Sequence, residues 1–344
     1  MTHTATEWRP NLPQARTEKA EAAVVKPAVK PPYEVGGHEV SARRGFGDSL
    51  AALARTDPRI VALDGDVKNS TYTEEFEGIA PNSFFQGYIA EQNIIGMSMG
   101  LAARGKVPIA SMFSCFVKRA YDFMRMAAIS KLGIKIAGTH CGISIGEDGA
   151  SQMGLEDLAM TCAEPDFTVL YPADATSAWR ATTLMVDQPG PCYLRLRRPE
   201  SPIPYGPAEE FAIGKCKILR KSDKNVALVV AAGVTVFEAL DAYEQLRKEG
   251  LAIRVIDLFS IKPIDRQEFT ASALAAGRTV ITVEDHFEYG GLGDAVLAAL
   301  SDAGVKTHKL AVQKVAHSGK PKELLDKFGI SSRHIVQAVK SALS

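Results

Sequence analysis

Short apolar segments alternate with amphipathic segments along this chain from about residue 40 onward, and this alternation limits the folds that it can adopt. A short apolar run between turn residues is typical of a buried strand, and apolar residues spaced three and four apart are typical of a helix. In the first half, strands are expected at residues 60–63, 107–113, 134–137, 168–171 and 192–196, and helices at residues 41–54, 91–104, 121–131 and 177–186. In the second half, strands are expected at residues 226–232, 253–257, 279–283 and 309–312, and helices at residues 235–248, 265–276 and 291–302. The pattern predicts an α/β chain of two domains with mostly parallel sheets flanked by helices.

Two segments of different composition divide the chain. Residues 1–36 contain three prolines within residues 27–32, which block a stable helix, so we expect a disordered tail there. The alternative is an arm that wraps around a partner. Residues 199–210 are rich in Pro, Ser, Gly and Glu and are typical of a linker. The sequence therefore predicts a tail followed by domains over residues 37–205 and 206–344.

Charge and cysteine content exclude several classes of protein. The 40 basic residues balance the 40 acidic ones, so net charge favours neither nucleic acid nor an anionic membrane as a partner. No apolar run approaches the roughly 20 residues that a membrane span requires. The 5 cysteines are widely spaced and lack metal-binding spacing, and no signal-peptide pattern opens the chain. These features favour a reduced, cytoplasmic protein without a metal site of its own.

Three motifs match known catalytic patterns only in part. Residues 142–146 read Gly-Ile-Ser-Ile-Gly, but the strand and helix that must flank a nucleophile elbow directly are not expected there. Residues 289–293 lack the glycine spacing of a dinucleotide-binding loop, so helix–strand packing explains them better. Residues 318–320 lack the upstream glycine of a P-loop. We expect none of the three to carry chemistry.

Polar loops that follow the expected strands are better candidates, because ligands of parallel α/β sheets bind beyond the carboxyl ends of the strands. The loop over residues 138–153 combines His140, Asp148 and Gln152 with several glycines, which let a backbone approach a ligand closely. A lone histidine is more often structural, but this combination is harder to explain by packing.

Four other features are ambiguous when taken alone. The arginines of residues 195–198 suit phosphate or carboxylate binding, or form a solvated basic edge. Arg43 lies at an expected helix N-terminus, where anions bind favourably. Phe113 and Phe116 form either core or a flat platform for a ring, and Glu91 at a helix start is usually only a first-turn charge.

Together these segments resemble the second half of the transketolase family. The resemblance rests on seven stretches, at residues 63–70, 89–93, 125–130, 140–157, 198–200, 261–263 and 282–286. It extends over about residues 38–344 and leaves the tail outside. The animal-type branch is most similar, because Gln152 stands where other branches have histidine. The resemblance implies a pyrimidine-binding domain followed by a transketolase C-terminal domain.

The resemblance also implies roles for particular residues. Glu91 would bind the aminopyrimidine nitrogen of thiamine diphosphate, with Phe113 and Phe116 stacked near that ring and Asp66 near the thiazolium. Glu91 and His140 would be catalytic. The residues implied to bind a sugar phosphate are Arg43, Ser70, His140, Asp148, Gln152 and Arg198. Arg198 would be the bidentate phosphate clamp. An amide at position 152 leaves open whether a proton moves there.

Transketolases bind the cofactor's diphosphate through Mg²⁺ or Ca²⁺ in an N-terminal domain with a Gly-Asp-Gly motif, and no such segment occurs in this sequence. The resemblance therefore implies a split enzyme, in which a separate N-terminal subunit binds most of the metal and diphosphate. A heterotetramer of two plus two chains is the expected assembly. The expected reaction transfers a two-carbon ketol unit from a ketose phosphate to an aldose phosphate, as in the pentose phosphate pathway. Alternatives are a subunit similar to deoxyxylulose-phosphate synthase, one similar to a 2-oxo-acid dehydrogenase beta subunit, or a non-catalytic regulatory subunit.

Overall fold

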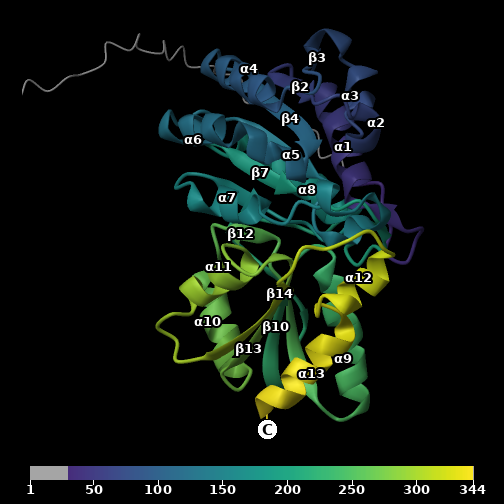
Figure 1. Ribbon diagram of the computed structural model, residues 1–344, viewed down its shortest axis with the longest axis vertical. Coiled ribbons are helices and arrows are strands. Elements are labelled where there is room, and N and C mark those ends of the chain that lie inside the picture. Colours follow the sequence, from purple (N-terminus) through teal and green to yellow (C-terminus); the bar gives the residue numbers. More distant parts are fainter. Residues whose placement is uncertain (1–29, 344) are drawn as a thin grey trace, which may run out of the picture.

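The computed structural model describes residues 30–343 as two α/β units that lie one above the other in Figure 1. The strands of the first unit are β1 (Val40–Ser41), β2 (Ile60–Asp64), β3 (Phe84–Gln86), β4 (Val107–Phe113), β5 (Lys135–Thr139), β6 (Thr168–Leu170), β7 (Cys192–Arg195) and β8 (Glu200–Ser201). Its helices are α1 (Ala42–Ala54), α2 (Lys68–Thr71), α3 (Glu74–Glu77), α4 (Glu91–Ala103), α5 (Ser114–Val117), α6 (Tyr121–Ile129), α7 (Asp157–Ala163) and α8 (Ala175–Asp187), with short 3₁₀ turns at Pro81–Ser83, Lys118–Ala120, Ile143–Asp148 and Ala150–Gln152. The expected fold class of two mostly parallel, helix-flanked sheets is confirmed.

The second unit has the same layered construction. Its strands are β9 (Lys217–Arg220), β10 (Asn225–Ala231), β11 (Ala252–Asp257), β12 (Ser260–Lys262), β13 (Thr279–Phe287) and β14 (Lys306–Val312). Its helices are α9 (Thr235–Lys248), α10 (Arg266–Ala275), α11 (Leu292–Ala299), α12 (Pro321–Lys327) and α13 (Ser332–Leu343). The five-stranded sheet has the order β14-β13-β10-β11-β9, and only the edge strand β9 is antiparallel to its neighbour.

The seven-stranded sheet of the first unit has the order β12-β6-β7-β5-β4-β2-β3. Six of its strands are parallel and come from the first unit, whereas β12 belongs to the second half of the chain. Ser260 of β12 pairs antiparallel with Leu170 of β6. The second half of the chain therefore completes the sheet of the first unit.

Side-chain alternation along the strands explains how each sheet is covered on both faces. Val61 and Leu63 of β2 pack with α4 and α6, whereas Ile60 and Ala62 pack on the opposite face with α1 and α8. In the second sheet, alternate residues of β10 pack toward α10 and α11 or toward α9 and α13, which lie on opposite sides of the sheet in Figure 1. One apolar cluster contains residues from both units, so the two sheets share a core.

The first long helix begins where the sequence predicts. Ser41 caps α1, and its hydroxyl oxygen accepts a hydrogen bond of 3.2 Å from the backbone N–H of Arg44. Phe46 and Leu50 of this helix are fully buried against α8, which has its own capping box at Asp174.

One local expectation needs correction. Residues 1–29 of the expected tail lie outside the described residues, but Tyr33 is buried and its hydroxyl donates to Asp48, so ordered chain begins before residue 37. The 3₁₀ turn Ala150–Gln152 precedes α7, which starts at Asp157. No helix within residues 30–343 is long and apolar enough to cross a membrane.

Candidate active site

The residues singled out in the sequence follow the carboxyl ends of five strands of the seven-stranded sheet. Asp66 follows β2, Glu91 follows β3, Phe113 ends β4, His140 follows β5 and Arg198 follows β7. These strands are parallel to one another, so their carboxyl ends lie along one edge of the sheet.

His140 is the centre of a polar cluster at this edge. Its backbone is in the left-handed region, with φ of 57°, and its side chain is buried. Its Nδ1 lies 2.9 Å from the hydroxyl of Thr139, and its Nε2 lies 3.3 Å from Nη1 of Arg43. Burial, together with the charges of Arg43 and Arg198, lowers the pKa of His140 to about 2. The imidazole is therefore neutral at physiological pH.

Arg43 connects three other members of this cluster. Its guanidinium donates to the backbone carbonyl of Ser70, and its Nη2 donates to the backbone carbonyl of Arg198 at 3.3 Å. Its Nε is buried without a hydrogen-bond partner among the described residues. The first turn of α1 thus presents a cation, with a donor still to be satisfied, beside His140.

Arg198 and Asp148 form the more open side of the cluster. Nη1 of Arg198 lies 2.7 Å from Oδ2 of Asp148, and these side chains are 42% and 35% exposed. Gln152 belongs to the same loop, but its side-chain oxygen is buried without a partner among residues 30–343. The guanidinium of Arg198 is accessible to an anion that would compete with Asp148 for it.

Phe113 and Phe116 form a flat aromatic surface next to His140. Their ring centroids are 5.7 Å apart with an interplanar angle of 12°, and Phe113 stacks on the imidazole of His140 at 3.7 Å. Both phenylalanines are half-buried. Of the two interpretations of this pair, a partly open platform fits better than a closed core.

Glu91 opens α4 at a separate pocket of about 410 Å³. Its carboxylate is buried, and Oε2 lies 2.9 Å from Nη1 of Arg119, whose side chain is 55% exposed. Sequence analysis missed Arg119, because no motif in the sequence indicates that this residue faces the start of α4. Asp66, exposed and at φ of 68°, accepts a hydrogen bond of 2.6 Å from Gln86.

The structure thus brings together Arg43, Ser70, Phe113, Phe116, His140, Asp148 and Arg198. Gln152 lies on the same loop but makes no hydrogen bond to the cluster among the described residues. Glu91 and Asp66 lie at the same sheet edge, each with a different polar partner, and no hydrogen bond or ion pair in the described chain joins them to His140. The role of every predicted residue remains a prediction.

The partial motifs have structural explanations. Ser144 is buried within a 3₁₀ turn rather than exposed on an elbow. The backbone N–H of Gly319 lies 3.4 Å from the carbonyl of Gly146, so two of the motifs pack on one another. Gly293 donates 3.0 Å to the buried carboxylate of Glu284, which matches the expected helix–strand packing.

Comparisons with known proteins agree across both units. A family model described as the transketolase pyrimidine-binding domain matches residues 38–204, and one described as the transketolase C-terminal domain matches residues 214–335. Transketolase-like protein 1 of Bos taurus is 44% identical over 336 residues, which cover 97% of this chain and 56% of that protein. Transketolase of Mus musculus is 45% identical over 334 residues, which cover 96% of this chain and 54% of that protein.

This chain therefore spans about half the length of the curated relatives that it matches. Both alignments include more residues than the chain contains from residue 37 onward, so the similarity extends into the segment that was expected to lie outside it. Among solved structures, a split-gene transketolase described as an inactive beta4 tetramer has a TM-score of 0.81 and 37% identity, covering 89% of this chain and 99% of that one.

Proposed function

This chain belongs to the transketolase family, and we propose that it is the pyrimidine-binding and C-terminal subunit of a two-chain transketolase. The proposed reaction transfers a two-carbon ketol unit from a ketose phosphate to an aldose phosphate. The observation that carries this proposal is the cluster in which two arginines and a buried, neutral His140 converge beside an aromatic surface. Such a cluster suits a ligand that is anionic at one end and rich in hydroxyl groups at the other.

The residues at the Glu91 pocket fit the aminopyrimidine end of thiamine diphosphate. A buried carboxylate lies in a pocket of about 410 Å³, where it can accept a hydrogen bond from a ring nitrogen that carries a proton. When bound, this cofactor supplies the stabilised carbanion that ketol transfer requires. In our proposal Glu91 orients the cofactor and controls a proton at its ring nitrogen, while Phe113 and Phe116 exclude water from the adjacent ring.

The substrate end of the proposed site lies at Arg43 and Arg198. The unpaired Nε of Arg43 and the exposed guanidinium of Arg198 would bind the sugar phosphate, with Arg198 exchanging Asp148 for the phosphate. His140 would act through neutral imidazole, which can donate or accept a hydrogen bond to a sugar hydroxyl. We keep Ser70, Asp148 and Gln152 as further substrate contacts and Asp66 as a residue near the thiazolium.

An exposed apolar surface around Glu91 supports the proposal that a partner subunit binds there. Tyr88 and Ile89, just before Glu91, are 68% and 70% exposed, and Phe123 of α6, which lines the Glu91 pocket with Ile89, is 38% exposed. Apolar side chains gathered on an otherwise charged surface mark a site of association. We propose that a diphosphate-binding subunit covers this surface and binds Mg²⁺ or Ca²⁺, in a cytoplasmic heterotetramer of two plus two chains.

The split-gene relative is described as an inactive beta4 tetramer. We propose by analogy that this chain alone also associates with itself and is inactive, because its own residues provide only part of the site.

The test is ketol transfer from xylulose 5-phosphate to ribose 5-phosphate, with thiamine diphosphate and Mg²⁺. This chain is assayed alone and then with the candidate partner subunit. We expect turnover only in the mixture, and turnover by the single chain would contradict the two-chain proposal. Product formed instead with pyruvate as donor would favour the deoxyxylulose-phosphate synthase alternative.

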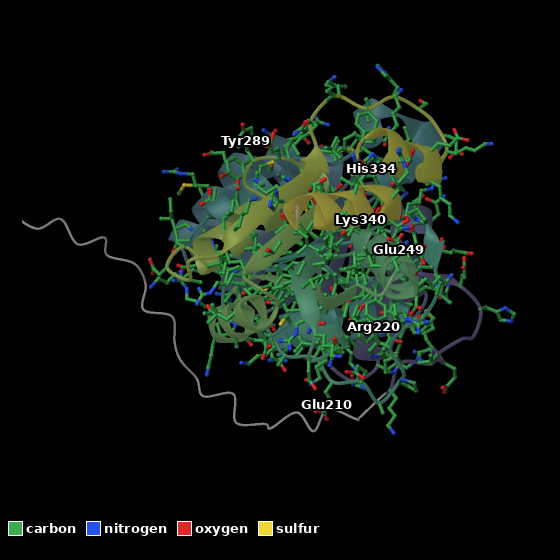
Figure 2. All side chains as sticks on the ribbon, turned by 90° about the horizontal axis from the view of Figure 1, so that it is seen from below. Glu210, Arg220, Glu249, Tyr289, His334 and Lys340 are labelled. Carbon is green, nitrogen blue, oxygen red and sulfur yellow. The ribbon has the colours of Figure 1, made fainter. Side chains whose placement is uncertain are left out.

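Two substitutions in the mixture separate an enzyme subunit from a regulatory one. Glu91→Ala should abolish transfer, because it removes the group that orients the cofactor. Glu210→Ala is the matched control, since Glu210 is exposed on the outer surface of the molecule (Figure 2) and makes none of the contacts described for the site. Full activity of the Glu91→Ala mixture would rule out the catalytic assignment.

A further inference from the structure

The loop that carries His140, Asp148 and Gln152 is held in place by the other domain. Between Val283 and Phe287 the pairing of β13 with β14 is interrupted, and this part of β13 contacts the loop. The side chain of Asp285, which is fully buried, accepts a hydrogen bond of 2.7 Å from the backbone N–H of Ile143. A carboxylate from the C-terminal domain thus fixes the backbone three residues after His140.

The backbone next to this contact leaves no room for a side chain. Gly142 has φ of 75°, and a Cβ placed on it would lie 1.9 Å from Oδ2 of Asp285. The carboxylate is therefore packed directly against the loop backbone, and only glycine permits that approach.

Further contacts align the same two segments. Nη2 of Arg195 donates both to the backbone carbonyl of Asp285 at 2.9 Å and to that of Gly154 at 3.0 Å. The backbone N–H of Phe287 donates 3.0 Å to the carbonyl of Leu155. The end of β13 is thereby joined to residues 154–155, where the loop ends, as well as to the start of the loop.

The tip of the loop rests on the C-terminal domain too. A Cβ on Gly149 would lie 2.6 Å from the hydroxyl oxygen of Ser318, so the backbone beside Asp148 is packed on that residue. The segment between His140 and Gln152 is consequently held at its start and at its tip by a domain that contributes none of the clustered polar groups.

We infer that Asp285 is a positioning residue, through which the C-terminal domain sets the substrate-binding geometry of the His140–Gln152 loop. The inference rests on the proposed function for its substrate, a sugar phosphate. A charge-assisted hydrogen bond to a backbone N–H is strong and directional. The start of the loop therefore occupies one position as long as Asp285 bonds to it. Loss of this bond leaves the pocket at Glu91 intact and lets the substrate contacts spread over several positions.

The first test measures hydrogen exchange at the backbone amides of residues 143–149 in the full chain without substrate. Asp285→Asn should accelerate exchange there roughly ten-fold, because a charge-assisted bond to a backbone N–H becomes a weaker neutral one. Asp257→Asn is the matched control, since Asp257 is an equally buried aspartate of the same sheet that bonds to Tyr205 instead. Unchanged exchange in Asp285→Asn would overturn the inference, whether or not the chain is a transketolase.

The second test uses the complex with the partner subunit. Asp285→Asn should raise KM for the sugar phosphates roughly ten-fold, while kcat and the affinity for thiamine diphosphate change far less. Gly142→Ala, which forces a Cβ into the same carboxylate, should give the same selective rise. A purely structural role predicts less active enzyme with normal KM, and that result would refute the inference. Absence of ketol transfer in the unsubstituted complex would refute the proposed function instead. The exchange measurement would still show whether Asp285 holds the loop in place.

Discussion

The ion pair between Asp157 and Arg195 should be the most sensitive electrostatic contact in this chain. The two side chains are 1% and 0% exposed, and Nε of Arg195 lies 2.8 Å from Oδ2 of Asp157. The hydroxyl of Tyr193 donates to the same oxygen at 2.7 Å. Burial alone would raise the pKa of Asp157, but Arg195 outweighs it and holds that pKa below its usual range. The carboxylate is therefore ionised in the folded chain.

Asp157→Asn keeps the size of the side chain and removes its charge, which leaves the Arg195 cation buried without its counter-ion. Breaking a buried pair in this way costs about 3–5 kcal/mol of unfolding free energy. This is a large part of the roughly 5–15 kcal/mol that stabilises an average domain. Urea unfolding, followed by the fluorescence of the buried Trp179, measures the loss directly.

The matched control removes a charge from an exposed pair. Glu75 lies 2.8 Å from Arg44, with both side chains more than a third exposed. Glu75→Gln should change the unfolding free energy by about 1 kcal/mol or less. If Asp157→Asn costs no more than this control, Arg195 has another counter-ion, and the buried pair does not stabilise the folded chain.

Three further outcomes are expected. The pH profile of ketol transfer by the complex should show no inflection from His140 between pH 5 and 8, because its pKa is about 2; an inflection lost in His140→Gln would contradict this. Burial raises the pKa of Asp257 to about 7 from 3.8, so the folded chain retains a proton that the unfolded chain releases between these values, and the unfolding free energy should fall as pH rises through this window. The carboxyl group of Asp257 contributes up to ~4 kcal/mol of this fall in unfolding free energy, and this contribution should be absent in Asp257→Asn. If the unfolding free energies of the unsubstituted chain and of Asp257→Asn depend on pH in the same way, this prediction is wrong. Gly233→Ala, which places a Cβ 2.0 Å from the ring of Tyr171, should lower Tm far more than Gly250→Ala, where φ is also positive but nothing lies within 4 Å. An equal fall in Tm for the two variants would show that the positive φ of the backbone, and not the contact with Tyr171, causes the loss of stability.

The sequence predicts the layered fold well because its signals are local. The strand signal at β10 and the helix signal at α1 depend only on neighbouring residues, and both predictions are confirmed. The family resemblance also directed attention to His140 and Arg198, which the structure places in one cluster.

Contacts between distant segments were beyond such reasoning. The pattern around Ser260 gives no sign that these residues pair with β6, ninety positions earlier, because the pairing depends on how the two domains pack. The contacts of Arg119 and Asp285 were missed for a similar reason. Their partners are a helix start and a backbone N–H, and neither is visible as a motif in the sequence.

The strand that crosses between domains also bears on how the chain is made. As the polypeptide leaves the ribosome, β6 emerges well before β12, and until then the edge of the first sheet has no neighbour there. An unpaired strand edge is a template for pairing with other chains, so the nascent first domain is exposed to aggregation during this interval. A fragment that ends at the linker over residues 199–210 would remain in that state permanently. The boundary between the domains is thus a poor place to divide the gene product for expression.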